Sequence, residues 1–149
     1  MSEETKSSRL MAIDPGKKRI GIAISDLSGS IAVPLTTIMH VSRLEDAKKI
    51  IEMAEANTVS CIIIGQALDE DGQLTNSAVQ ASRLGEQIVS RTTIPVKYWD
   101  ETGTTFEARK SRLEMKIPRK KRRGHHDSIA AVLILQNYID SLNSFSGDG

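Results

Sequence analysis

Hydrophobic residues near the start of the chain alternate with a period of two, which predicts three short strands. The stretch RLMAID is an apolar run that ends at Asp14, and in RIGIAISD three isoleucines (Ile20, Ile22 and Ile24) alternate with small residues. Such alternation is typical of a strand with one buried face. SIAVPLTTIM predicts a third strand, in which Pro34 is tolerated best at a sheet edge or a β-bulge. Short turns between the three strands predict a meander.

The next residues predict a helix. Ser42 and Glu45 have the spacing of a capping box. The apolar residues after Ser42 then recur at helical spacing on one face: Leu44, Ala47, Ile50, Ile51 and Ala54.

The rest of the chain predicts alternating strands and helices. SCIIIG is typical of a strand covered on both faces. A helix follows from Ala78 to Val89, with Leu84, Ile88 and Val89 as its apolar positions. IPVKYWDE is the fifth strand, and DSIAAVLILQNYIDSL has the length and composition of a helix. This order predicts an α/β fold with one mixed sheet and helices on its faces.

The 149 residues suit a single domain, which we place at residues 9–142 between disordered tails at 1–8 and 143–149. No apolar run approaches the ~18 residues of a membrane span, so we expect no membrane partner. The polar first residues contain no apolar signal segment, so we expect a cytoplasmic protein. Cys61 is the only cysteine, and its place in SCIIIG favours a small buried hydrophobe over a reactive thiol.

One basic segment dominates the charge pattern. Residues 109–123 hold nine Lys or Arg and one Glu, a local balance of +8; since the net charge is +1, the remainder carries −7. A solvated loop is the simpler explanation. We favour contact with a polyanion because so many like charges repel one another without a counter-charge. Nucleic-acid phosphates would supply that charge, and the cluster at residues 119–123 is Arg119, Lys120, Lys121, Arg122 and Arg123.

Three acidic residues stand at the ends of predicted elements. Asp14 and Glu101 end strands, where sites form in open α/β sheets. Asp127 opens the last helix and could either cap it or act as a ligand. Because strand side chains alternate, Asp100 and Glu101 cannot both point toward one site if the strand stays regular.

Three converging carboxylates would repel one another unless a cation joined them. Oxygen ligands suit Mg²⁺ or Mn²⁺, and such ions can activate a water for phosphodiester cleavage. His125 and His126 flank Asp127 and could ligate metal, bind phosphate, move a proton, or simply be polar residues before a helix. We assign no role to His40. DPGKKRIG lacks the known phosphate-loop patterns and leads into a strand, so it is a poor phosphate loop.

Several blocks of the sequence together resemble the YqgF/RuvX family. They are AIDPGKKRIGIAISD, AVPLTTI, the pair IIIG and DG at Ile62–Gly65 and Asp71–Gly72, DETGTTFEAR, and GHHDSIAAVLILQNYID, and they follow the family order across residues 10–140. Members are small bacterial proteins described as pre-16S rRNA nucleases and Holliday junction resolvases. The resemblance implies a ribonuclease H-like fold: a mixed five-stranded sheet whose first three strands are antiparallel, flanked by helices.

The resemblance also implies roles for individual residues. The family's metal-binding, catalytic acids fall on Asp14, Glu101 and Asp127. Its basic turn falls on Gly16–Arg19, so that Lys17, Lys18 and Arg19 are expected to contact the nucleic-acid backbone, and its second threonine falls on Thr105, an auxiliary position.

Two departures from the family pattern change the picture. Thr102 and Gly103 stand where relatives usually have Arg-Leu, and Gly65-Gln66-Ala67 stands where they have Gly-Leu-Pro. Loss of that arginine removes a partner for phosphate or carboxylate, and Gly103 loosens the turn that positions Glu101.

Three functions remain open from the sequence. The leading hypothesis is a Mg²⁺- or Mn²⁺-dependent endonuclease that matures the 5′ end of pre-16S rRNA. A resolvase of branched DNA is the alternative with the same chemistry. The third is a nucleic-acid-binding factor that keeps the fold without efficient cleavage, and the Thr102-Gly103 departure motivates it. Oligomeric state is not predicted.

Overall fold

The structure is a computed structural model, and it describes residues 9–69, 71–101, 104–116 and 122–147. For residues 104, 105, 107, 122–127 and 144–147 it describes the backbone alone. The elements of the described part are β1 (Leu10–Pro15), β2 (Arg19–Ser25), β3 (Ala32–Met39), α1 (Arg43–Ala56), β4 (Cys61–Gln66), α2 (Asn76–Val89), β5 (Val96–Asp100), α3 (Thr104–Met115) and α4 (Arg122–Gly147).

The strands form one mixed sheet in the order β3-β2-β1-β4-β5. β1, β2 and β3 pair antiparallel, whereas β4 lies parallel to both β1 and β5. The predicted meander and mixed sheet are confirmed. Because β1 sits at the centre between an antiparallel and a parallel neighbour, its carboxyl end lies beside the carboxyl end of β4.

Pro34 occupies the kind of position that the sequence predicts. β3 is an edge strand, and its pairing with β2 shifts register between Ile22 and Ala23, opposite Pro34. A residue without an N–H group is accommodated there because the ladder is already irregular.

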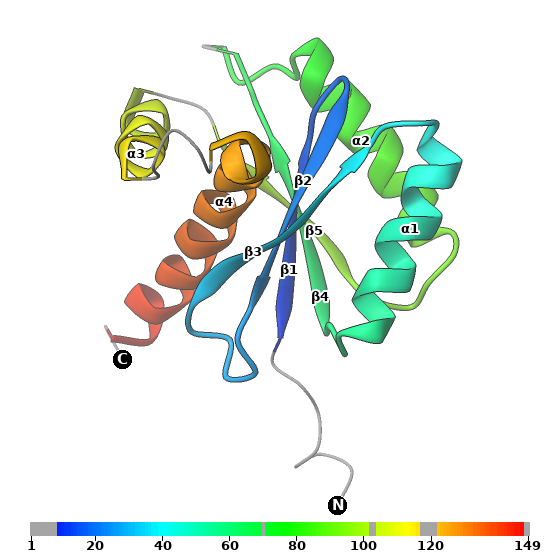
Figure 1. The fold of residues 1–149 in the computed structure, drawn as a ribbon, viewed down its shortest axis with the longest axis horizontal. Helices are drawn as coiled ribbons and strands as arrows, with labels where there is room; N and C mark the ends of the chain where they lie inside the picture. The colour runs from blue at the N-terminus through cyan, green and yellow to red at the C-terminus, as the bar shows by residue number, and fades with distance from the viewer. Residues whose placement is uncertain (1–8, 70, 102–103, 117–121, 148–149) are drawn as a thin grey trace, which may run out of the picture.

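Helices cover both faces of the sheet in separate pairs (Figure 1). α1 and α2 pack together on one face, and α4 crosses the other face with α3 outside it. Side chains of alternate strand positions therefore enter two cores. One core faces α1 and α2 and includes Ile13 and Ile64; the other faces α4 and includes Ala12 and Ile63.

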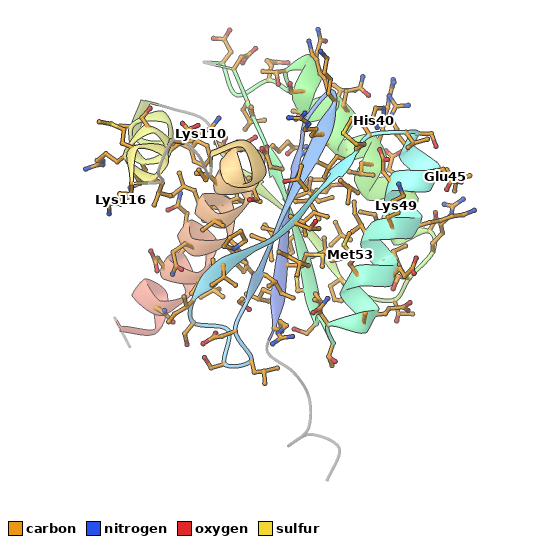
Figure 2. The ribbon with its side chains drawn as sticks, viewed as in Figure 1. His40, Glu45, Lys49, Met53, Lys110 and Lys116 are labelled. Atoms are coloured by element: carbon orange, nitrogen blue, oxygen red, sulfur yellow. The ribbon has the colours of Figure 1, made fainter. Side chains whose placement is uncertain are left out.

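α1 begins as predicted, with one addition. The Ser42 hydroxyl accepts a hydrogen bond from the Glu45 N–H at 3.1 Å and caps the helix. Leu44, predicted to face the core, is 37% exposed, whereas Asp46 is 1% exposed. Asp46 turns inward because its carboxylate holds the strand-to-helix connection. Figure 2 shows Glu45 on the outer side of α1 and Met53 on the sheet side.

The end of α2 and both ends of α4 also differ from the predictions. Val89, predicted to be an apolar contact of α2, is 57% exposed because it is the last residue of that helix. α4 begins at Arg122, five residues before Asp127, and continues to Gly147, inside the segment that we assigned to a tail. Asp127 is therefore inside the helix, and the N-cap interpretation of this residue is wrong. No helix in the described part of the chain is long and apolar enough to cross a membrane.

Candidate active site

Asp14 lies on the α4 face of the sheet, at the carboxyl end of the central strand. Ala12 belongs to the core under α4 and Ile13 to the opposite core. Since strand residues alternate faces, Asp14 falls on the same side as Ala12. It pairs with Gly21 of β2, so the strand is still regular at this position. Its side chain is half-buried and has an interaction partner.

The tight turn after Asp14 depends on glycine. A Cβ atom on Gly16 would lie 2.3 Å from the carbonyl oxygen of Arg19. The chain can therefore reverse directly after Pro15 and leave three exposed cations on the turn: Lys17, Lys18 and Arg19. This confirms that the glycine serves the reversal of the chain.

Glu101 reaches the same face from the end of β5, on the far side of β4 from Asp14. The Lys97 ammonium donates a hydrogen bond to the Tyr138 hydroxyl of α4 at 3.0 Å, and the Trp99 ring packs edge-on against Tyr138. Alternation places Glu101 on this α4 face too. The Glu101 N–H donates to the Gln66 carbonyl at 3.0 Å, which extends the strand geometry by one residue past β5.

Asp100 faces the opposite side and is excluded from this site. Tyr98, two residues earlier, turns its hydroxyl toward Gly85 and the Ser82 carbonyl on α2. Asp100 shares that face by alternation. The prediction that the two adjacent acids diverge is confirmed.

Gly65 provides the space in which the Glu101 carboxylate lies. It follows Ile64, which pairs with Ile13, so Gly65 stands beside Asp14 at the end of β4. A Cβ atom there would lie 3.2 Å from Oε2 of Glu101 and 2.4 Å from Cδ1 of Ile134. A side chain at this position would therefore displace the end of the Ile134 side chain and crowd the Glu101 carboxylate.

α4 carries Asp127 toward the same edge of the sheet. Ala131 and Ile134 of α4 are buried in the core between this helix and the sheet. They fall four and seven positions after Asp127, in one stripe of the helix. At 1.5 Å per residue, Asp127 lies about 10 Å beyond Ile134 along the axis, toward the carboxyl ends of the strands. Its side chain is outside the described part, as are those of Thr105, His125 and His126.

The arrangement of the acids fits a hard divalent cation. Asp14 and Glu101 supply oxygen donors from the ends of β1 and β5, which flank β4, and Gly65 of β4 lets the Glu101 carboxylate lie close to the sheet. Among the described side chains, no three His, Cys, Asp or Glu residues group closely enough to hold a metal ion. Asp127 is the third acid of the predicted set, and its backbone lies in α4, beyond Ile134 in the direction of the carboxyl ends of the strands.

The predicted basic residues fall at the β1–β2 turn, at the start of α4 and in a segment outside the described residues. Arg119, Lys120 and Lys121 lie in that segment, and the side chains of Arg122 and Arg123 at the start of α4 are likewise not described. The described part adds Arg112 of α3 and Lys116 directly after it, both exposed. Figure 2 shows Lys110 on α3 and Lys116 at its end, in the layer beyond α4.

Comparison with known proteins places the chain in a family. A family model described as "RuvX: Holliday junction resolvase" matches residues 8–141. The chain belongs to the RuvX family. Among curated relatives, a "Putative pre-16S rRNA nuclease" of Thermoanaerobacter pseudethanolicus is 42% identical over 89% of this chain and 96% of its own length. A protein of the same name from Clostridium acetobutylicum is 36% identical over 90% of this chain and 99% of its own.

Solved structures support the ribonuclease H-like fold of this RuvX-family chain. Thermus thermophilus RuvC, solved with a Holliday junction substrate, matches 89% of this chain and 94% of its own with a TM-score of 0.54. Fowlpox virus resolvase, solved with Holliday junction DNA, matches 90% of this chain and 98% of its own with a TM-score of 0.59. Both are 12% identical to it, so the likeness concerns the fold alone.

This chain departs from the RuvX-family pattern at two described positions, Gln66 and Ala67, and at two positions outside the described residues. Gly65 itself is kept and has a geometric role, while the Thr102-Gly103 departure lies outside the described residues. Sequence reasoning also missed the pairing of His40 with Asp46. The signal was available: an aspartate in the first turn of a helix, six residues after a histidine that ends a strand.

Proposed function

We propose that this protein is a divalent-metal-dependent endonuclease that hydrolyses phosphodiester bonds, with the 5′ end of pre-16S rRNA as its substrate in the cytoplasm. The observation that carries the proposal is the placement of Asp14 and Glu101 on one face of the sheet, on either side of Gly65. Membership of the RuvX family, and relatives that are named as pre-16S rRNA nucleases, support the nuclease chemistry.

Each acid has a distinct place in the proposed mechanism. Asp14 and Glu101 would hold Mg²⁺ or Mn²⁺ at the carboxyl ends of β1 and β5, with Asp127 of α4 as the third ligand. When bound, such ions supply an activated water and stabilise the leaving oxygen of the phosphodiester. The carboxylates themselves contribute negative charge on rigid strand ends, so that the ligand geometry is fixed before substrate arrives.

The surrounding cations would hold the polyanionic substrate against this acidic edge. Lys17, Lys18 and Arg19 extend from the turn that directly follows Asp14. The described part also offers Arg112 of α3, and the basic residues 119–123 stand in the sequence at and just before the start of α4. Cations at these positions can neutralise phosphates beside the bond that is cut, without sequence preference. His125, His126 and Thr105 are the auxiliary candidates beside them.

A cleavage assay with two substrates tests the proposal. Labelled pre-16S leader RNA and a four-way DNA junction are each incubated with Mg²⁺, Mn²⁺ or EDTA. The proposal expects cleavage of the RNA that requires metal and is lost in Asp14→Asn and Glu101→Gln, while both variants still bind RNA. Asp100→Asn is the matched control because it neutralises the acid next to Glu101 on the other face, and it should cleave normally.

The other outcomes favour different functions. Cleavage of the junction but not of the RNA would support a resolvase. The description of the RuvX family as Holliday junction resolvases and the similarity to the fold of Fowlpox virus resolvase favour this alternative. Binding without cleavage in any metal would support a nucleic-acid-binding factor. Cleavage that persists in Asp14→Asn would contradict the acidic site itself.

A further inference from the structure

A pocket of about 510 Å³ lies at the same edge of the sheet as Asp14, but on the opposite face. We call it the α1–α2 pocket. Its walls come from the β1–β2 turn, the end of β3 and the first turns of α1 and α2. Its volume lies within the range of small-molecule sites. It is separate from the candidate acidic site because its floor belongs to the core that faces α1 and α2.

The polar half of the α1–α2 pocket favours an anion. Lys17 from the β1–β2 turn and Arg43 from α1 line it, together with the N-terminal ends of two 14-residue helices. Helix N-termini present N–H groups and partial positive charge. The Arg43 guanidinium donates to the side-chain oxygen of Gln80, which holds it between the two helices.

One acidic residue lines the pocket, and its charge is already engaged. Asp46 is buried, and its carboxylate contacts Nδ1 of His40 and accepts a hydrogen bond from the Val41 N–H at 3.0 Å. This arrangement fixes the His40 ring at the pocket wall through one nitrogen. With Asp46 engaged, the charged side chains of the pocket that can meet a ligand are the cations Lys17 and Arg43.

The remaining lining of the pocket includes apolar side chains. Ile20 and Leu84 form its floor, being 2% and 3% exposed, and Pro15 borders it. Asn76 and Gln80 add side-chain amides along the rim. An apolar surface beside a few amides and a cationic end is suited to a heterocycle that carries a phosphate.

We propose that the α1–α2 pocket binds a nucleoside monophosphate unit. Its phosphate lies between Lys17, Arg43 and the two helix N-termini, and its base packs on Ile20 and Leu84. The unit is either a free nucleotide or an unpaired nucleotide of a nucleic-acid chain. The second source rests on the proposed function: only Pro15 and Gly16 separate Asp14 from Lys17, so one strand passing over the turn would contact both faces.

Calorimetric titration in EDTA tests the proposal without contribution from a metal-loaded acidic site. The four nucleoside monophosphates, the matching nucleosides, inorganic phosphate, and trinucleotides with and without a 5′-phosphate are the ligands. We expect a monophosphate to bind more tightly than its nucleoside or inorganic phosphate. Lys17→Gln and Arg43→Gln should each weaken that binding about tenfold, the loss expected for one charged hydrogen bond.

Lys49→Gln is the matched control, since Lys49 is an exposed cation of α1 outside the pocket. It should leave the affinity within about twofold, and thermal melting should show all three variants folded. If the 5′-phosphorylated trinucleotide binds more tightly than the monophosphate, and Arg43→Gln abolishes this difference, the pocket binds a nucleotide of a nucleic-acid chain. Equal affinity of the two ligands assigns the pocket to a free nucleotide.

Two results would overturn the proposal. One is a monophosphate that binds no better than inorganic phosphate, and the other is equal weakening in Lys49→Gln and Arg43→Gln. The proposed function is judged separately by Asp14→Asn, which should lose cleavage but keep the monophosphate affinity. Failure of one idea is thereby distinguished from failure of the other.

Discussion

Gly65 is the residue where packing and chemistry are most closely joined. The position touches Ile134 of α4 on one side and the Glu101 carboxylate on the other. Ile134 is fully buried, so the end of its side chain can shift only within a packed core, and the Glu101 backbone is held by its N–H bond to the Gln66 carbonyl. The absence of one side chain therefore sets both the approach of the helix and the place of an acid.

Gly65→Ala should lower both the stability and the cleavage activity. The added methyl group overlaps Cδ1 of Ile134, and overpacking of this kind costs about 1–3 kcal/mol in the free energy of unfolding. Urea unfolding measures the cost. Ile134→Val removes the overlapping atom, so the double variant should lose less stability than the sum of the two single variants. Strict additivity would show that the two positions do not interact.

Asp46→Ala should destabilise the protein by about 2–4 kcal/mol, because it removes a buried carboxylate that holds His40 and the Val41 N–H. Glu45→Ala is the control: Glu45 is exposed and its ion pair with Lys48 spans 3.9 Å, so its loss should change stability by less than about 0.5 kcal/mol. Urea unfolding of both variants provides the comparison. Equal effects would contradict a structural role for the Asp46 contacts.

At the scale of elements, the β2–β3 connection is organised by Asp26. Its carboxylate accepts hydrogen bonds from the Ser30 N–H at 2.8 Å, the Ile31 N–H at 3.2 Å and the Ser28 hydroxyl at 2.9 Å. These bonds, led by the one from Ser30, hold the pKa of Asp26 below its usual value of 3.8.

The stability of wild type relative to Asp26→Asn should consequently depend on pH. Because the folded pKa is the lower one, the ionised carboxylate stabilises the folded state fully above 3.8, and this contribution is lost as pH falls through the folded pKa. In urea unfolding from about pH 6 to pH 3, the difference in the free energy of unfolding between wild type and Asp26→Asn should stay constant above about pH 5. It should then shrink as the pH falls further. Glu52→Gln, at an exposed position of α1, is the control. A difference that grows toward low pH would contradict the assigned sign.

Helix α3 and Lys116, the residue that follows it, should contribute to nucleic-acid affinity through charge alone. Replacing Arg112 and Lys116 with Gln removes two cations, so the slope of log affinity against log salt should become shallower by about 1.4–1.8. Filter binding with leader RNA at several salt concentrations measures it. The double variant Lys48→Gln/Lys49→Gln on α1 removes equal charge from the other side of the molecule and should leave the slope nearly unchanged.

The elements that sequence alone predicted were those with regular apolar spacing. The strands from Leu10 to Met39 and the buried run of β4 follow that spacing, so their order and faces were predictable. The start of α4 was not, because RRGHH carries no apolar pattern. A helix nucleated by its buried half nevertheless extends into polar residues, since each added residue gains a hydrogen bond. That extension is what removes Asp127 from the capping position.

The candidate site was predictable to a similar degree. Placement of Asp14 and Glu101 follows from strand ends and alternation, which a sequence displays directly. The inward turn of Asp46 and the clearance at Gly65 depend on contacts between elements distant in sequence, and local patterns do not encode these. Resemblance identified the acids, while packing identified the space around them.

At the scale of the whole molecule, Cys61 reports on opening of the sheet. It starts β4, which lies between β1 and β5, and it is 9% exposed. Burial raises the pKa of the Cys61 thiol, with Lys97 opposing that shift, so less thiolate is present near pH 8 than for a free cysteine.

Reaction of Cys61 with a chromogenic disulfide should therefore be slow in native protein and fast in urea. The rate should rise in parallel with the unfolding transition followed by circular dichroism, because β4 is released only when the sheet opens. Gly65→Ala should react faster than wild type at equal urea. Rapid native reaction, with no dependence on urea, would contradict the burial.

The position of α4 after all five strands has a consequence for synthesis of the protein. β1, β4 and β5 are complete well before the 26 residues of α4 have been added. Until then, the sheet face that includes Ala12 and Ile63 lacks its cover, and the nascent chain exposes an apolar surface on which it can aggregate. Any site that requires a residue of α4 likewise forms only at this late stage, so a partly made chain on its ribosome carries two strand-end acids without the third.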